Sequence, residues 1–153
     1  MILPPNLSRL RWWSYAPLAS FPHLGLLETK IWREFLRQYP LFFDRVTYDV
    51  GVGETAPTAE NETDNYVRMV KRLSEKRIDV VATKQDMLYL VEIKHWASSV
   101  QLGQLLIYKS LFQQRFPDAP VPNLLILCQM PAIDLFSEAG KQNIQAISIS
   151  LPF

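Results

Sequence analysis

Apolar residues recur along the chain with the two periods that are typical of helices and of buried strands. Four apolar residues at helical spacing predict a helix over 23–38 that ends before Pro40: Leu24, Leu27, Ile31 and Phe35. Further helices are predicted over 66–74, from a cap at Ser98 or Ser99 to Phe116, and over 132–141. Runs rich in β-branched and aromatic residues predict strands over 41–50, 77–83, 87–94, 121–129 and 144–149. This order, αβ(α)ββαβαβ, predicts an α/β fold in which a mixed β-sheet is flanked by helices.

The length of the chain suits one domain. Its 153 residues, 48% of them hydrophobic, can bury one substantial core and fall short of the usual size for two. Residues 1–22 contain four of the 11 prolines and the adjacent Trp12 and Trp13, which predicts an N-terminal arm that lies across the domain. We expect residues 23–153 to form a single domain, with an exposed acidic loop at 54–64.

Two charged residues stand one position apart in an otherwise apolar predicted strand, in the sequence VEIKHW. They are Glu92 and Lys94, and we expect both to be buried, which is costly for charges that lack partners. If residues 85–86 form a two-residue turn, Asp79 lies directly opposite Glu92, with Cβ atoms about 5 Å apart. Because side chains alternate along a strand, Lys94 shares that face. Either a divalent cation lies between the two acids or the three side chains form a salt-bridged polar strip.

Polar residues on the neighbouring helices can extend this group. Gln101, Gln104 and Tyr108 form one stripe on the helix after the strand, beside an apolar stripe. The alternative for Gln101 is a solvated position on the helix surface. Glu28 interrupts the apolar stripe of helix 23–38 and should face inwards, either as a third acid at a metal or at a capping or rim position.

These residues resemble the PD-(D/E)XK nuclease superfamily in its RecB-like branch. The pieces that carry the resemblance are, in chain order, Glu28, Asp79, the run Glu92-Ile93-Lys94, and Gln104 with Tyr108. The proline of the superfamily signature is absent, since Ile78 precedes Asp79. The resemblance covers most of the chain, because the family core αβββαβ matches the predicted elements from residue 23 to about residue 129.

The resemblance implies a restriction-endonuclease-like core and a nuclease that hydrolyses phosphodiester bonds with Mg²⁺ or Mn²⁺, with DNA the favoured substrate. Asp79, Glu92 and the backbone carbonyl of Ile93 would hold the cation, and Glu28 is a further candidate ligand. Lys94 would position or deprotonate the attacking water. Gln104 and Tyr108 would orient the lysine or hold a substrate phosphate.

The charge distribution narrows the choice of partner. The net charge is +1 at pH 7, so any nucleic-acid contact must come from a local patch. The candidates for that patch are Arg68, Lys71, Arg72, Lys76 and Arg77, together with Gln101. So small a nuclease often needs a second subunit to cut two strands, so a homodimer is a further hypothesis. No stretch has the length of a membrane span, and we expect an intracellular, cytoplasmic protein.

Two other functions compete with the nuclease hypothesis. The protein could be a catalytically inactive nuclease-fold component that binds DNA or serves in viral assembly. The presence of Asp79, Glu92 and Lys94 argues against this, because an inactive relative would be free to lose them. It could instead be a protein-interaction domain, for which the near-neutral net charge is the best argument.

Overall fold

A mixed sheet with strand order β1-β2-β3-β4-β5-β6 forms the centre of this computed structural model, which describes residues 1–53, 59–74 and 76–152. Its strands are β1 (Trp13–Ser14), β2 (Arg45–Val52), β3 (Lys76–Lys84), β4 (Met87–Ala97), β5 (Asn123–Pro131) and β6 (Ile144–Ser148). The helices are α1 (Pro5–Ser8), α2 (Leu26–Gln38), α3 (Asp64–Ser74), α4 (Ser99–Arg115) and α5 (Leu135–Lys141). Neighbouring strands are antiparallel from β1 to β4 and parallel from β4 to β6. The predicted element order and the predicted α/β class are confirmed.

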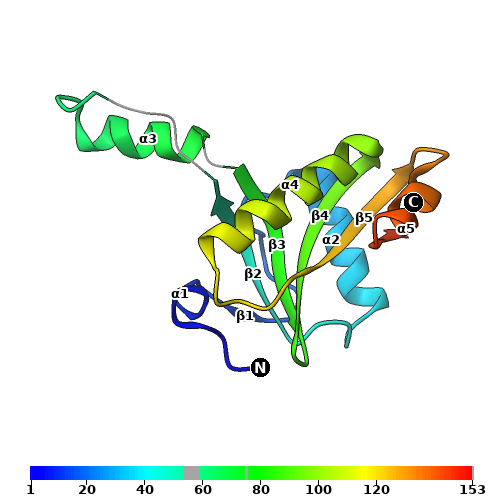
Figure 1. Ribbon diagram of the computed structural model, residues 1–153. Coiled ribbons are helices and arrows are strands. Elements are labelled where there is room, and N and C mark those ends of the chain that lie inside the picture. Colours follow the sequence, from blue (N-terminus) through cyan, green and yellow to red (C-terminus); the bar gives the residue numbers. More distant parts are fainter. Residues whose placement is uncertain (54–58, 75, 153) are drawn as a thin grey trace.

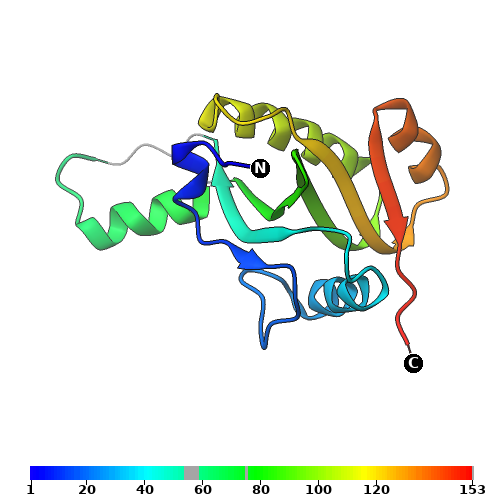
Figure 2. The same ribbon diagram turned by 90° about the horizontal axis from the view of Figure 1, so that it is seen from below.

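Helices cover both faces of the sheet, as Figure 2 shows, with α4 on one side and α2 on the other. One apolar cluster lies under α4 and includes Leu90 and Leu105, and a second lies under α2 and includes Val91 and Phe35. Successive residues of β4 therefore point into different clusters. Burial on both faces explains why the central strands read as nearly continuous apolar runs.

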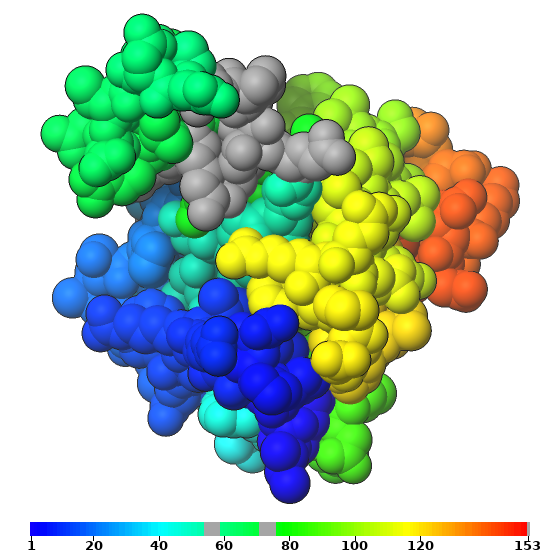
Figure 3. All heavy atoms as spheres, turned by 60° about the vertical axis from the view of Figure 1, so that its left-hand side comes forward, coloured from blue at the N-terminus to red at the C-terminus, as the bar shows by residue number. Residues whose placement is uncertain are grey.

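The N-terminal arm packs onto the body and adds a short edge strand to the sheet. Trp13 in β1 pairs with Val46 of β2, and Leu7 of α1 is fully buried. The Trp12 Nε1 donates a hydrogen bond to the Leu7 carbonyl at 3.0 Å. Figure 3 shows this blue segment lying against the body. The two tryptophans are therefore packing residues of the fold, in an arm that lies across the domain.

The predicted strand over 41–50 begins later than expected, at Arg45. Leu41 is 90% exposed, and Phe42 and Phe43 pack against each other edge-on instead of entering the sheet. Asp44 closes this turn, because its backbone N–H donates to Thr83 and its carboxylate accepts from the Gln85 backbone N–H. Aromatic residues favour strands only where a neighbouring strand and a face to pack on are both present. The other boundaries differ by a few residues.

Helix α3 projects from the body of the protein (Figure 1). It begins at Asp64, two residues before the predicted start at Tyr66, and the side chains of Tyr66, Val67 and Met69 are at least 37% exposed. Residues 54–58 of the predicted acidic loop lie outside the described part of the chain.

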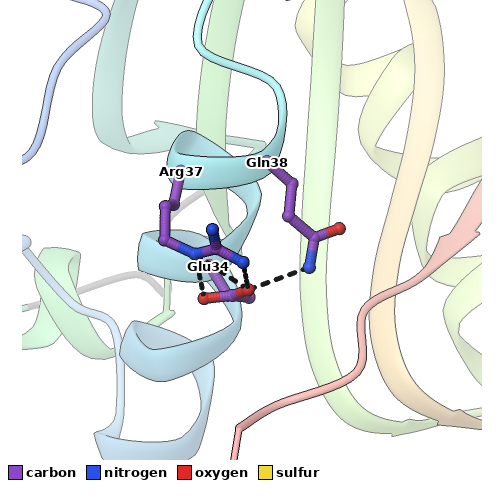
Figure 4. A network of polar contacts seen from close by, with 3 residues as sticks. All are labelled: Glu34, Arg37 and Gln38. Atoms are coloured by element: carbon purple, nitrogen blue, oxygen red, sulfur yellow. Dashed lines mark hydrogen bonds and ion pairs between the residues drawn. The ribbon is translucent and has the colours of Figure 1, made fainter.

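Helix α2 carries a buried carboxylate near its end, shown in Figure 4. Glu34 accepts hydrogen bonds from Arg37 Nε at 3.0 Å and from Gln38 Nε2 at 2.9 Å. The bonds from Arg37, and then the bond from Gln38, hold the pKa of Glu34 at about 2, below its ordinary 4.5. The negative charge of Glu34 is thus favoured in the folded protein.

Glu34→Gln should remove a pH-dependent part of the stability. Because the folded pKa of Glu34 is lowered, the ionised group stabilises the fold above pH 4.5, and this contribution is lost as the pH falls from 4.5 towards 2. Thermal unfolding of both proteins across this range should show melting temperatures that converge at the acidic end. Glu138→Gln, which breaks a surface pair with Lys141, serves as the control. A constant difference at every pH would contradict the assignment.

None of the helices in the described ranges is both long enough and apolar enough to cross a bilayer.

Candidate active site

Strands β3 and β4 separate at the position of the predicted acids. Their paired residues run from Lys84 with Met87 to Val80 with Val91, the register that a two-residue turn requires. Both strands continue beyond that point, to Lys76 and to Ala97, but the described pairing does not. The same parting is visible in Figure 1. Asp79 and Glu92 are the first residues past the last pair.

A side chain replaces the missing ladder bond at this point. The Ile93 backbone N–H donates to Asp79 Oδ2 at 2.9 Å, so the carboxylate of one strand takes the place of a backbone carbonyl. This bond fixes the orientation of Asp79 and satisfies an amide that the separating strands would leave buried without a partner.

A cavity of about 660 Å³ opens where the two strands separate. The segment leading into α2 and the first turn of that helix form one wall, and α4 forms another. The lining residues are His23, Leu24, Gly25, Glu28, Lys76, Arg77, Asp79, Glu92, Ile93, Lys94, Gln104 and Tyr108. The fold therefore gathers, around one cavity, all the residues that the sequence suggested for catalysis and metal binding.

The two acids on β3 and β4 have strongly perturbed pKa values. Glu92 is 6% exposed, and burial, followed by the nearby charge of Asp79, raises its pKa to about 9, while Lys94 acts in the opposite direction. Burial also raises the pKa of Asp79 to about 6, against the effect of the Ile93 hydrogen bond. The pair therefore holds a proton at neutral pH unless another positive charge enters the cavity.

The donor set of the two acids suits a hard divalent cation. Glu92 Oε2 is buried and receives no hydrogen bond from an N–H group of the described residues, and its contact with the Asp79 carboxyl is favourable only when the two acids share a proton. No three His, Cys, Asp or Glu side chains in the described ranges are grouped to hold a metal. A cation here would therefore rely on two carboxylates, a backbone oxygen and water, a combination that Mg²⁺ accepts. Glu28 lies on the cavity wall, half-buried.

Lys94 is exposed, contrary to the expectation that both charges of the strand are buried. The expectation treated β4 as covered along its length, whereas β3 has already separated from it at this point. Lys94 is two residues after Glu92 and so follows it on the same face of the strand. Its ammonium group remains hydrated at the open side of the cavity, where it can meet an incoming anion.

Two polar residues of α4 face the acids from the other wall. Gln104 and Tyr108 are one helical turn apart, and Gln104 Nε2 donates to the Tyr108 hydroxyl at 2.6 Å. Burial raises the pKa of Tyr108, and only 6% of this residue is exposed. The hydrogen bond fixes both side chains in the cavity wall.

Gln101 does not belong to the cavity, and its expected place on a nucleic-acid surface is wrong. It is 6% exposed, and its Oε1 accepts a hydrogen bond from the Ser98 backbone N–H at 2.8 Å. The Ser98 side chain in turn caps the first turn of α4. Gln101 is therefore the second half of a capping box that fixes where the helix begins.

The predicted basic patch is only partly gathered at the cavity. Lys76 and Arg77 line it, whereas Arg68 lies on α3 and donates to Asn65 of the same helix at 3.1 Å. Lys71 and Arg72 belong to α3, but their side chains lie outside the described part of the structure.

Two further residues shape the site and were not assigned to it from the sequence. The Asp49 carboxylate accepts a hydrogen bond from Arg77 and lies 3.7 Å from His23 Nδ1. Both residues adopt left-handed backbone conformations, with φ of 57° at Asp49 and 67° at His23. Such conformations are unfavourable for most residues and concentrate at functional sites. The available signal was a charge inside a strand of β-branched residues, the same signal that marked Glu92.

No family model matches the chain, and no curated protein matches it. Among solved structures, a repair endonuclease from Pyrococcus abyssi aligns over 88% of this chain and 50% of its own, with 10% identity and a TM-score of 0.50. A structure of an EndoMS–dsDNA complex aligns over 89% of this chain and 50% of its own, with 11% identity and a TM-score of 0.48. The chain thus spans about half the length of these proteins. The likeness to the repair endonuclease supports the restriction-endonuclease-like core and concerns the fold alone.

Proposed function

We propose that the protein is a metal-dependent nuclease that hydrolyses phosphodiester bonds, with DNA as the favoured substrate, and that it is a member of the PD-(D/E)XK superfamily in its RecB-like branch. One observation carries the proposal: the buried acid Glu92 lies against the half-buried Asp79 in a cavity that also holds an exposed lysine. Burying such a pair lowers the stability of the fold, and a bound cation and a phosphate would balance its charge.

Asp79, Glu92 and the backbone carbonyl of Ile93 would hold Mg²⁺ or Mn²⁺, with Glu28 as a further candidate ligand. When bound, the cation would neutralise phosphate charge and lower the pKa of a bound water. Lys94, at the open side of the cavity, would hold the attacking water or accept its proton and stabilise the negative charge that develops on the phosphate. The Gln104–Tyr108 pair would hold a phosphate oxygen through hydrogen bonds.

Cations at the start of β3 would bind the backbone of the substrate. Lys76 and Arg77 line the cavity, and Asp49 holds the guanidinium of Arg77. A homodimer would allow both strands of a duplex to be cut, and light scattering after size-exclusion chromatography tests this hypothesis.

The purified protein should cleave nucleic acid only when a divalent cation is present. Supercoiled plasmid, circular single-stranded DNA and single-stranded RNA are incubated with Mg²⁺, Mn²⁺ or EDTA, and products are separated on gels. Cleavage of circular DNA that occurs with Mg²⁺ or Mn²⁺ but not with EDTA supports an endonuclease, because circular DNA has no end at which an exonuclease could start. Activity that persists in EDTA contradicts the metal requirement, and binding without cleavage under all conditions favours the inactive nuclease-fold alternative.

A further inference from the structure

A second, more apolar cavity of about 460 Å³ lies beside the candidate active site. Its lining residues are Lys76, Ser99, Val100, Gly103, Gln104, Ile107 and Tyr108. Three of them, Lys76, Gln104 and Tyr108, also line the active-site cavity, so the two spaces share a wall. We call the second space the α4 groove, because most of its lining comes from α4.

The floor of the α4 groove is an exposed apolar surface with a gap in its middle. Val100 is 68% exposed and Ile107 is 51% exposed, and Gly103 lies between them on the same side of the helix. Gly103 stands in the interior of α4, where glycine is less stable than any other residue except proline.

Folding does not require glycine at position 103. Apart from its chain neighbours and the backbone of α4 itself, a Cβ atom placed there would meet no atom of the described residues within 4 Å, and no positive φ is recorded for this residue. A helix that leaves out a side chain where the described residues would admit one, next to a candidate catalytic cavity, leaves a space that a ligand can enter. Glycine is a common choice where a ligand approaches a backbone closely.

We propose that the α4 groove binds the base of a nucleotide adjacent to the scissile phosphate, an inference that rests on the proposed nuclease function. The apolar floor matches the flat face of a base, and the shared wall places that base next to a phosphate in the active-site cavity. The ammonium of Lys76, which lines both spaces, complements the phosphate between them.

This placement limits the class of substrate. A base can enter the α4 groove only after it has left the stack of a duplex. The preferred substrate is therefore single-stranded or frayed nucleic acid, whose bases are free to be splayed onto the protein.

A second copy of this chain is the competing occupant of the groove. Helix α3 projects from the body and exposes Tyr66 and Met69, which a groove on a neighbouring subunit could cover. The wall shared with the acids and the cationic Lys76 favour an anionic nucleotide over an apolar helix face, and the experiment includes this alternative among its outcomes.

Gly103→Leu fills the α4 groove without removing any polar group. Gly140→Leu is the matched control, because Gly140 lies in α5, outside both cavities, and a Cβ there also meets no described atom within 4 Å. Both variants should fold, as circular dichroism and thermal unfolding will show. The probes are a labelled oligothymidylate of about 12 nucleotides, within the length that one single-strand site covers, and an abasic oligomer of the same length and charge.

Binding is measured by fluorescence anisotropy in EDTA, so the result does not depend on cleavage. The parent protein should bind the oligothymidylate about tenfold more tightly than the abasic oligomer. Gly103→Leu should reduce this ratio to nearly one while leaving affinity for the abasic oligomer within a fewfold, and Gly140→Leu should keep the parent ratio.

Two binding results would overturn the inference: a parent protein that binds both oligomers equally, or a Gly103→Leu variant that keeps the parent preference for the oligothymidylate. A third result would assign the groove to a second copy, namely a parent dimer that Gly103→Leu converts to a monomer in light scattering. A protein that shows the expected ratios but cleaves no substrate would instead contradict the proposed nuclease function and leave the base site standing.

Discussion

Lys94→Ala should lower the single-turnover cleavage rate by about two to four orders of magnitude while changing DNA affinity only within a fewfold. The side chain is exposed at the open side of the cavity, two residues after the buried Glu92 and on the same face of β4. There it can act on the attacking water or on the charge of the transition state. Because a lysine that is exposed contributes little to packing, stability should change by no more than about 0.5 kcal/mol. Rapid-quench kinetics at saturating DNA measures the rate, and anisotropy with Ca²⁺ measures the affinity.

Lys141→Ala provides the control for this experiment, since Lys141 is an exposed lysine on α5 that pairs only with a neighbour on the same helix among the contacts described. It should cleave at the parent rate. If Lys94→Ala weakens affinity and rate by the same factor, the lysine is a phosphate contact only. Another group would then have to activate the water, and Gln104 is the next candidate.

Glu92→Gln should abolish cleavage, with a loss of at least about three orders of magnitude, and should also abolish stabilisation by Mn²⁺. The substitution keeps the shape of the side chain but removes the buried carboxylate that a cation would pair with. In the parent protein, Mn²⁺ at a hundred times its dissociation constant should raise the melting temperature by about 5 to 10 °C. Differential scanning fluorimetry with Mn²⁺ and with EDTA measures this shift independently of activity.

Without metal, Glu92→Gln should be about as stable as the parent protein at neutral pH, because burial and the charge of Asp79 raise the pKa of Glu92 to about 9 and the parent therefore already buries a neutral side chain there. Glu138→Gln on α5 should behave as the parent protein in every respect. A Mn²⁺-induced shift that survives in Glu92→Gln would place the cation elsewhere, and normal cleavage by this variant would refute the site.

The sequence predicted the register of β3 against β4 because that register depends on local information. A two-residue turn at 85–86 fixes which residues of β3 and β4 face each other, and counting outwards from it reaches Asp79 and Glu92. The exposure of Lys94 could not be predicted in the same way. It depends on where β3 leaves β4, and this separation is a tertiary property that no residue pattern in either strand records.

Two errors in the predicted site have different origins. The prediction for Gln101 used helical periodicity and overlooked a local signal, since a serine followed three residues later by glutamine is the pattern of a capping box. The contribution of Asp49 was missed although its charge stands inside a strand of β-branched residues, because that signal does not identify its partner. Its contact with Arg77 depends on a left-handed backbone conformation in the middle of β2. Aspartate tolerates this conformation, but its presence in the sequence does not predict it.

Strand β4 has an interior position in the sheet and yet, from Glu92 onwards, behaves like an edge on one side only. Along its other side the parallel ladder with β5 continues past the acids, pairing Glu92 with Ile126, Lys94 with Cys128 and Ala97 with Pro131. The backbone of β4 is thus held by β5 on one side, while its other side is open to the cavity. Strand β3 likewise stays paired with β2 past Asp79, as far as Lys76, so both acids stand on strands that the sheet still holds from the outside.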